Sequence, residues 1–468
     1  MPFCDRVNIK IDHPYMRFER HIRYAIDVLL KDVLEIDCEI PVQVYYGHEL
    51  YRNKSSYIPT VQIVPSKFFT KEAYLSAHSL PPSPISWVEI SKFMPLRVNF
   101  FEGNIPVIYW GLKNREDVVI KGDNVITSVI DIIASTFFMV TRYEEMIVKD
   151  RDEYDRFPAT SSLGYKEGFL HRPIVNEYAE LLWDWIIALV PHARRKRKAY
   201  QLSLTHDVDQ ICKFGAVSKD IRIIVSLALK HVQPVRAMKH LIGMCQTRIG
   251  RAKDPFYTYD ELMDISEQKG SKACFYFMAR ESAACDTGYD VTEKKVVRII
   301  ENILNRGHEV GLHPSIGSYL SYEKLHHEKE QLDKILGYSN YGGRQHYLQW
   351  KGPDTWRFYE KVGLTHDSSV GYVETPGFRC GICMPFYVFD VLAGRKLNLR
   401  EIPLITTDTS VFSKKYHDFE YDQIKNKLVK SIKYRVKKVS GNYCLLWHNS
   451  SYHKYGVEAL NDLINNDN

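Results

Sequence analysis

The chain has 468 residues, of which 45% are hydrophobic and 26% are charged, and this length exceeds what one ordinary core organises. We therefore expect at least two domains. The 63 Lys and Arg against 57 Asp and Glu give a net charge of +6, which is too small an excess to indicate a nucleic-acid partner.

The N-terminal part mixes helical and strand-like patterns. In chain order, it predicts a helix at 17–34, strands at 41–46, 57–64 and 106–110, and helices at 131–146 and 175–189. We interpret residues 1–190 as an α/β or α+β domain of unknown role without a catalytic constellation. Arg142, Glu144 and Glu145 are interpreted there as a solvated or salt-bridged helix end.

Targeting signals are absent from the pattern. The N-terminus lacks the apolar core of a secretory signal, and the apolar run Val125–Val140 contains Asp131 and Ser135 and is too short to span a bilayer. We interpret this run as a buried helix. Nine scattered cysteines, with Cys380 and Cys383 as a single CxxC, indicate a reducing compartment. We expect a cytoplasmic protein without a transmembrane segment.

Two basic segments flank the start of the C-terminal part. Residues 191–198 read PHARRKRK and are interpreted as a solvated linker rather than a localisation or phosphate-binding patch. An insertion at about 213–253 holds an apolar stretch with basic residues at 221–232 and a second basic helix at 237–251. Such a pair can make peripheral contact with a membrane. Packing over the domain and covering a substrate cleft are alternatives that the sequence leaves open.

The C-terminal part alternates strands and helices. After a first strand at 202–208, the predicted elements are helices at 259–269, 292–305, 322–336, 354–362 and 421–436, and strands at 273–277, 309–312, 343–346, 399–404 and 442–447. This alternation is typical of βα units in a parallel sheet or barrel.

Charged and imidazole groups close several of these strands. Asp207 and Asp209 end the first, and at an i, i+2 spacing their side chains point to one side. Two such carboxylates need a cation or a shared proton to relieve their repulsion. His313, Arg344 with His346, and His448 follow later strands. In barrels of βα units the working residues occupy such strand ends.

These residues carry a resemblance to a known family. The segments THDVD at 205–209, GHEVGLHPS at 307–315, RQHY at 344–347 and LLWH at 445–448 resemble, in the same order, the motifs of polysaccharide deacetylases (the NodB-homology group, carbohydrate esterase family 4). The resemblance covers about 199–455. The N-terminal part is similar to the uncharacterised domain that precedes this module in some bacterial proteins.

The resemblance implies a distorted (β/α) barrel over 199–468 and a divalent metal, often zinc. It also implies roles for individual residues. Asp207 corresponds to the general base, Arg344 to the arginine that orients it, and His448 to the histidine that protonates the leaving amine. Asp209 and His313 correspond to metal ligands.

One position departs from the family pattern. The family has a second histidine four residues after the first, and here that position is Gly317. His346 is the candidate replacement because it lies at i+2 from Arg344. His206 is turned away from Asp209 by strand alternation, and water is a further alternative. Tyr347 and Arg379 are predicted to bind substrate.

The leading hypothesis is a metal-dependent hydrolase that removes N-acetyl groups from a sugar of a bacterial envelope or surface polysaccharide, or of its precursor. Its expected partner is therefore a carbohydrate substrate. One alternative is a non-catalytic carbohydrate-binding protein on the same fold, which Gly317 favours. Another is a hydrolase of a different C–N bond. A glycosyltransferase reading of Asp207-x-Asp209 leaves His313, Arg344 and His448 without roles.

Overall fold

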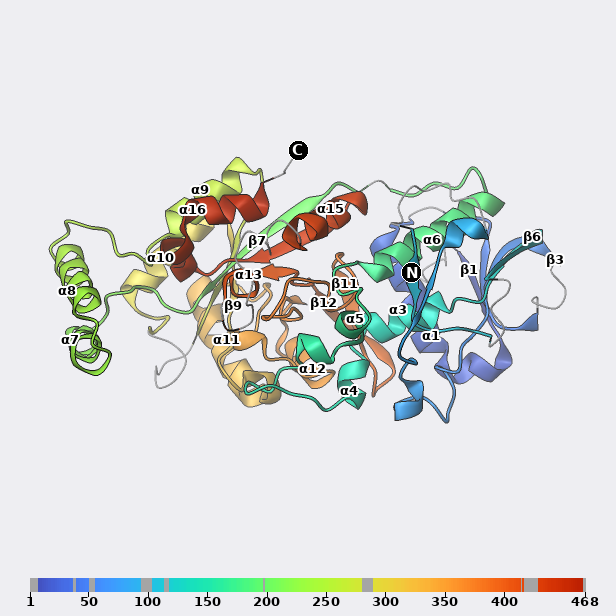
Figure 1. Cartoon of the computed structure of the whole chain (residues 1–468), viewed down its shortest axis with the longest axis horizontal. Coiled ribbons are helices and arrows are strands. Elements are labelled where there is room, and N and C mark those ends of the chain that lie inside the picture. The colour runs from blue at the N-terminus through green and yellow to red at the C-terminus, as the bar shows by residue number, and fades with distance from the viewer. Residues whose placement is uncertain are drawn as a thin grey trace. The chain divides into compact units, whose positions relative to one another are not determined.

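A computed structural model describes residues 7–36, 39–49, 55–93, 103–112, 118–196, 198–279, 289–413, 415 and 428–465 of the chain (Figure 1). It is a mixed α/β protein with parallel sheets, which confirms that part of the predicted fold class, whereas the barrel stays a prediction. The chain forms two compact units, Met1–Gln201 with Tyr347–Cys444 and Leu202–His346 with Leu445–Asn468. No described helix is long and apolar enough to cross a membrane.

The first unit contains a four-stranded sheet in which all neighbours are parallel. In spatial order its strands are β1 (Asn8–Ile11), β2 (Gln43–Tyr46), β3 (Ser55–Ile63) and β6 (Val119–Ser128). The longer helices are α1 (Glu19–Asp27), continued by the π-helix η2 (Val28–Val33), α3 (Ile132–Val140) and α6 (Ile174–Leu189). Shorter elements are η1 (His13–Phe18), η3 (Ala77–Ser79), the antiparallel pair β4 (Ser86–Val88) and β5 (Ile105–Val107), η4 (Ile90–Lys92), α4 (Glu144–Ile147), η5 (Ala159–Ser161) and α5 (Leu163–Lys166).

Residues 347–444 complete this unit. They form α12 (Asp354–Val362), β10 (His366–Asp367), β11 (Phe386–Asp390), β12 (Arg395–Glu401), β13 (Thr406–Thr407), α13 (Asp408–Phe412) and α15 (Lys430–Lys438). The Tyr24 hydroxyl of α1 donates to the Tyr387 carbonyl of β11 at 2.8 Å. Because such bonds tie this segment to the N-terminal helices, the compact units do not follow the predicted division at the 191–198 linker. The domain boundaries 1–190 and 199–468 stay a prediction.

The apolar run Val125–Val140 is part strand and part helix. Its first residues end β6, and its last form α3, in which every side chain is buried. The side chain of Asp131 caps α3 by accepting a hydrogen bond from the backbone N–H of Ala134 at 2.9 Å. Arg142 has a φ of +53°, a left-handed conformation that separates α3 from α4. The single helix predicted at 131–146 is therefore wrong.

The second unit is organised around parallel strands. β7 (Gln201–Val208) pairs with β8 (Cys274–Phe277), and β8 pairs with β9 (Glu309–Leu312), so that Asp207, Tyr276 and Gly311 are register partners. A Cβ on Gly311 would lie 2.7 Å from the Tyr276 ring, so glycine makes room for this tyrosine. β14 (Asn442–Leu446) neighbours β7, and the chain passes between units within it. An isolated parallel bridge joins Leu312 to Gly343.

Helices surround these strands. They are α7 (Val217–Val225), its π-helical continuation η6 (Ser226–Lys230), α8 (Pro234–Arg248), α9 (Tyr259–Gln268), α10 (Lys294–Asn305), η7 (Ser318–Leu320), α11 (Tyr322–Leu336) and α16 (Asn449–Ile464), with the turn η8 (His346–Leu348) at the unit boundary. Helices α9 and α16 lie side by side, and Nζ of Lys269 donates to Oδ1 of Asn465 at 2.6 Å (Figure 1).

Most predicted elements are confirmed with small changes at their ends. The strand expected at 343–346 is only the Gly343 bridge. The strand expected at 399–404 is β12, which pairs antiparallel with the unpredicted β11. Residues 421–427 of the helix expected at 421–436 lie outside the described residues, and α15 covers most of the rest.

Candidate metal centre

Polar residues from separate segments of the second unit meet at the carboxyl ends of its strands. Asp209 follows β7, His313 follows β9, and His346 follows the Gly343 bridge by three residues. Because β7, β8 and β9 are parallel, residues that follow them start from the same edge of the sheet. The structure thus brings the three predicted metal ligands together.

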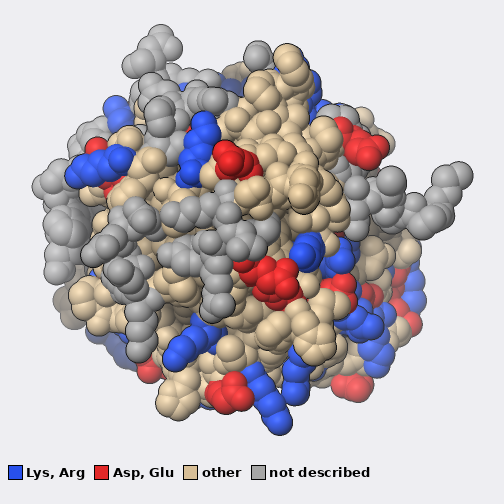
Figure 2. All heavy atoms as spheres, turned by 90° about the vertical axis from the view of Figure 1, so that its right-hand side faces the viewer, with Lys and Arg blue, Asp and Glu red and all other residues tan. Residues whose placement is uncertain are grey.

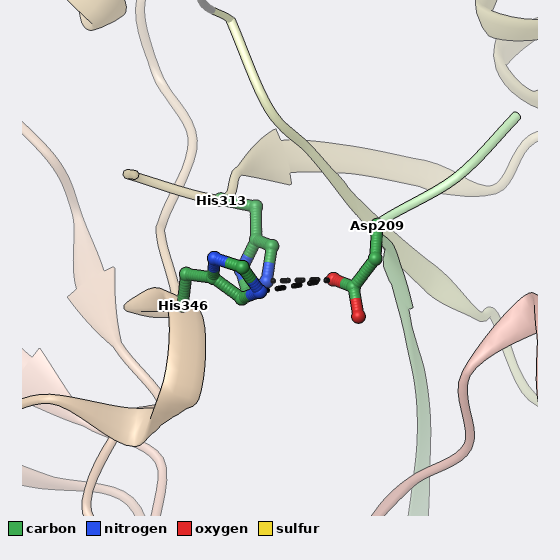
Figure 3. Close-up of side chains that lie close together, drawn as sticks. All are labelled: Asp209, His313 and His346. Carbon is green, nitrogen blue, oxygen red and sulfur yellow. Dashed lines mark ion pairs between the residues drawn. The ribbon is translucent and has the colours of Figure 1, made fainter. Parts of the chain in front are cut away.

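Asp209, His313 and His346 form a compact group in which both imidazoles point toward the carboxylate (Figure 3). Nε2 of His313 lies 3.2 Å from Oδ1 of Asp209, and Nε2 of His346 lies 3.8 Å from the same oxygen. One ligand atom of each residue lies within 4.8 Å of the others. Tetrahedral zinc with bonds of about 2.0–2.1 Å separates its ligand atoms by about 3.3 Å. The group is therefore close to the spacing of a metal site.

Hydrogen bonding leaves ligand atoms of this group available. Nδ1 of His313 lies 2.6 Å from the carbonyl oxygen of Arg344, to which it donates. This bond orients the ring and leaves Nε2 directed at Asp209, as is usual for a metal-ligating histidine. Nε2 of His313 and Oδ1 of Asp209 are buried, and neither makes a hydrogen bond of good geometry within the described residues. Two nitrogens and one carboxylate oxygen are donors that suit zinc or a similar divalent ion.

Neighbouring charges shift the pKa values of Asp209 and His313 in opposite directions. Burial raises the pKa of Asp209, but the charge of His448 and the contacts with His313 and His346 outweigh burial and hold it well below its usual range. Burial lowers the pKa of His313, but Asp207 and Asp209 outweigh burial and raise it. Asp209 is therefore ionised at neutral pH and can serve as an anionic ligand.

Asp207 is held separately, beside the metal-ligand group. Its Oδ1 accepts a hydrogen bond from Nη1 of Arg344 at 3.1 Å, and the same nitrogen donates to Oγ1 of Thr205 at 2.8 Å. Arg344 is fully buried, with its guanidinium 4.7 Å from the centre of the Tyr276 ring. The other carboxylate oxygen of Asp207 lies 3.8 Å from Nε2 of His313. Arg344 thus fixes the carboxylate with one oxygen facing the histidine.

His448 approaches from the remaining side of Asp209. It is the N-cap residue of α16, and its Nε2 lies 3.7 Å from Oδ2 of Asp209. Its side chain is 21% exposed, so the ring reaches solvent. The structure therefore gathers six of the predicted residues in one place, while their roles stay predictions: Asp207, Asp209, His313, Arg344, His346 and His448.

The structure gives a local reason for the departure at Gly317. Gly317 is the N-cap residue of η7 and has a φ of +82°, a left-handed conformation that favours glycine. His346 instead brings the second imidazole to Asp209. His206 is turned away, as predicted, because its Nδ1 lies 2.8 Å from the Trp447 carbonyl oxygen and its ring packs on Phe275.

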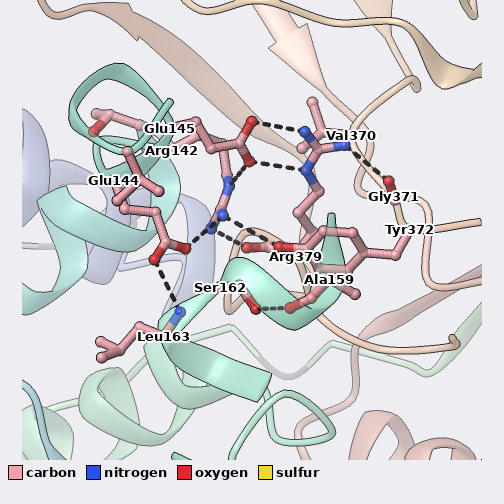
Figure 4. A network of polar contacts seen from close by, with 12 residues as sticks. Arg142, Glu144, Glu145, Ala159, Ser162, Leu163, Val370, Gly371, Tyr372 and Arg379 are labelled. Atoms are coloured by element: carbon pink, nitrogen blue, oxygen red, sulfur yellow. Dashed lines mark hydrogen bonds and ion pairs between the residues drawn. The ribbon is translucent and has the colours of Figure 1, made fainter. Parts of the chain in front are cut away.

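Arg379, which was predicted to bind substrate, is buried among charged residues. It lies in the first unit, in a buried network with Arg142, Glu144 and Glu145 (Figure 4). Its Nε and Nη2 donate to the two carboxylate oxygens of Glu145 at 2.9 and 2.7 Å, and Nη1 donates to the Gly371 carbonyl at 2.9 Å. The side chain is 2% exposed, and its predicted role in substrate binding stays a prediction.

Tyr347 follows His346 in the chain but belongs to the first unit. Its ring stacks on Tyr154 with centroids 4.7 Å apart, and it remains 38% exposed. Its predicted role in substrate binding stays a prediction.

Two supporting residues were not predicted from the sequence. Thr205 accepts from Arg344, and Tyr276 lies against the same guanidinium. Strand alternation carried a signal for Thr205, which lies at i−2 from Asp207 and shares its side of β7. Tyr276 required the register between β7 and β8.

Comparisons with known proteins add limited information. The model of a family of unknown function (DUF7033) matches residues 13–191, less than half of the chain. No curated protein matches the chain. A solved structure described as "putative polysaccharide deacetylase from Mycobacterium smegmatis" is similar at a TM-score of 0.35 and 14% identity, covering 57% of this chain and 84% of that one. A TM-score this low gives the structural similarity no weight.

Proposed function

We propose that the protein is a metal-dependent hydrolase that removes N-acetyl groups from a sugar of a bacterial envelope or surface polysaccharide, or of its precursor. The observation that carries the proposal is the convergence of Asp209, His313 and His346 beside an Asp207 carboxylate held by Arg344. The motif resemblance supports the substrate class and the distorted (β/α) barrel, which belong to the same proposal.

The proposed chemistry begins with a water molecule that attacks the acetyl carbonyl. A divalent ion held by Asp209, His313 and His346 would polarise that carbonyl and lower the pKa of the water. Asp207 accepts the proton that the water loses. Its Oδ2 suits this role because it lies 3.8 Å from Nε2 of His313 and therefore faces the proposed metal ligands. Arg344 keeps this carboxylate in place through its other oxygen.

Completion of the reaction requires a proton on nitrogen. An amine anion is a poor leaving group, so the nitrogen must be protonated as the C–N bond breaks. His448 supplies this proton in the proposal. Its position beside Asp209 and its partial exposure allow it to contact a reacting group and to exchange protons with solvent.

The direct test is acetate release from oligomers of N-acetylglucosamine and from peptidoglycan fragments, after incubation of the protein with zinc, cobalt or nickel. We expect the Asp207→Asn variant to lose about 10²–10⁴-fold in kcat while retaining its metal. Asp260→Asn, which alters a partly exposed carboxylate of α9, is the matched control and should retain full activity. Unchanged kcat in Asp207→Asn would contradict the assignment of the base. Metal-loaded protein without acetate release would favour the non-catalytic carbohydrate-binding alternative.

Helix α16, which His448 caps, also supplies the control variant for testing the role of His448. His448→Ala should lower kcat more than it raises KM, because the proton transfer occurs in the transition state. His453→Ala, which removes an exposed histidine of α16, should leave both constants unchanged. Equal effects of the two substitutions would assign His448 a structural role only.

A further inference from the structure

Helices α7 and α8, with η6 between them, form a hairpin within residues 213–253. The two helices pack on each other and stand apart from the strands of their own unit (Figure 1). Asp220 is buried between them and pairs with Nε2 of His240 at 3.3 Å and Nη2 of Arg248 at 3.0 Å. Met244 is also buried on the inner side. The hairpin is therefore a built element with a defined inner face.

The outer face of the hairpin is unusually apolar. Ten of the 24 large hydrophobic side chains that are exposed within the described residues belong to it. The most exposed lie around the tip, where Leu229 and Val232 are each 78% exposed and Val235 is 67% exposed. Exposed apolar side chains that gather in one segment in this way mark an interaction site, whereas single exposed apolar residues scattered over a surface do not.

The spacing of these residues gives each helix one apolar stripe. Residues three, four or seven positions apart lie on the same helical face. The exposed apolar residues follow this spacing. They are Val217, Ile221 and Val225 on α7, and Val235, Met238 and Ile242 on α8 with Ile249 at its C-cap.

The same segment is strongly basic. Residues 213–253 contain nine Lys and Arg and one acidic residue, Asp220, whereas the remaining chain has 54 Lys and Arg against 56 Asp and Glu. Figure 2 views the molecule from the right-hand side of Figure 1, and on that face Lys and Arg are interspersed with Asp and Glu. Arg222 and Lys230 are exposed, and each directly follows an exposed apolar residue in the chain, Ile221 and Leu229 respectively. Their aliphatic stems can lie along an apolar surface while the charged ends reach outward.

We infer that this hairpin binds the surface of an anionic lipid bilayer. An apolar stripe bordered by Lys and Arg matches the boundary between acyl chains and negatively charged headgroups. A second copy of the chain would bring two basic faces together, and a nucleic acid would leave the apolar stripe uncovered. The exposed residues Leu229 and Val232 would enter the boundary first. This inference does not depend on the proposed hydrolase activity.

The test uses the full chain and sedimentation with lipid vesicles. One set of vesicles is phosphatidylcholine, and the other contains roughly one quarter phosphatidylglycerol. We expect binding to the anionic set only, and binding should weaken as salt screens the headgroups. The double variant Leu229→Glu/Val232→Glu should lose at least about tenfold in partitioning, and Lys230→Glu roughly fivefold or more.

Controls separate this surface effect from a loss of folding. Leu392→Glu alters a residue of the first unit that is 58% exposed, and it should bind vesicles as the parent does. All variants should retain the thermal midpoint and the metal content of the parent. Absence of binding to anionic vesicles, or equal binding by the Leu229→Glu/Val232→Glu variant, would overturn the inference. A dimer of the parent that this variant abolishes, without vesicle binding, would assign the face to a second copy instead.

Discussion

The two buried clusters of charged residues differ in how their polar atoms are satisfied. In the first unit, Arg142, Glu144, Glu145 and Arg379 pair carboxylates with guanidiniums (Figure 4). In the second unit, Asp209, His313 and His346 direct possible metal-ligand atoms at one another (Figure 3). Burial alone therefore does not indicate function. Convergent ligand atoms form a candidate ion site, whereas balanced ion pairs indicate a structural role.

The Arg142 network shows how complete the balance is. Glu144 accepts from Nη2 of Arg142 at 2.8 Å and from the backbone N–H of Leu163 at 2.9 Å. Arg142 also donates to the Arg379 carbonyl. Burial raises the pKa of Glu145, but the charges of Arg379 and Arg142 outweigh burial and lower it. The predicted salt-bridged helix end is thus correct in its pairing, but it is buried rather than solvated.

The largest expected effect is on the stability of this network. Glu145→Ala leaves two buried guanidiniums without their shared carboxylate and should lower the free energy of unfolding by about 3–5 kcal/mol. Urea denaturation measures the change. Asp209→Ala in metal-free protein should change stability far less, because an imidazole left without its partner can lose a proton, whereas a guanidinium cannot. Equal losses in the two variants would remove the distinction between the clusters.

Metal affinity should respond at the second cluster only. His346→Ala removes one ligand and should weaken zinc binding at least about 10–100-fold, which titration calorimetry measures. His326→Ala, which alters an exposed histidine of α11, is the matched control. Unchanged affinity in His346→Ala would show that another group completes the site.

A third kind of buried site consists of two neighbouring carboxyl side chains. Asp367 and Glu401 are register partners on β10 and β12, and both are fully buried. Burial raises the pKa of Asp367 to about 6 and raises that of Glu401 well above its usual value.

This pair predicts a pH-dependent stability. The folded state binds more protons than the unfolded state once pH exceeds about 4, so stability is present below that pH and is lost as pH rises through 6. Between pH 5 and pH 8 the titration of Asp367 alone should cost the parent about 1–2 kcal/mol. Glu401 adds to this loss in the parent, so Glu401→Gln should lose less. Urea midpoints at the two pH values measure this difference. An equal loss in the variant would exclude the pair as the cause.

The smallest effect is expected at the surface. Arg306 contacts Asp264 and Glu267 at 2.6 and 2.8 Å, but these groups are solvated. Arg306→Ala should change the free energy of unfolding by about 0–1 kcal/mol, as measured by urea denaturation. A loss as large as that of Glu145→Ala would mean that pairing, rather than burial, sets the cost.

The sequence predicted the strand ends of the second unit because local patterns determine them. Asp207, Asp209 and His313 follow apolar runs whose periodicity is visible in the chain. The place of His346 in the site could also be predicted, because its i+2 spacing from Arg344 indicated that the two side chains point the same way.

Long-range pairing could not be predicted in this way. Glu145 meets Arg379 across 234 residues, and no local pattern connects them. The break at Arg142 depends on that buried environment rather than on helix propensity, since neither Gly nor Pro marks it. The antiparallel pairing of β11 with β12 is different, because these strands form a local hairpin around the short turn 391–394. Gly394 and the alternating burial pattern of β12 are the local signal for it, which the strand predicted at 399–404 did not use.

The measurement that tests the central claim most directly is the metal content of the purified protein beside its Asp209→Ala variant. The proposed site predicts about one divalent ion per chain, zinc or a similar metal, in the parent and its loss in the variant. Absence of metal in the parent after incubation with zinc, cobalt and nickel, or equal metal in both proteins, would contradict it.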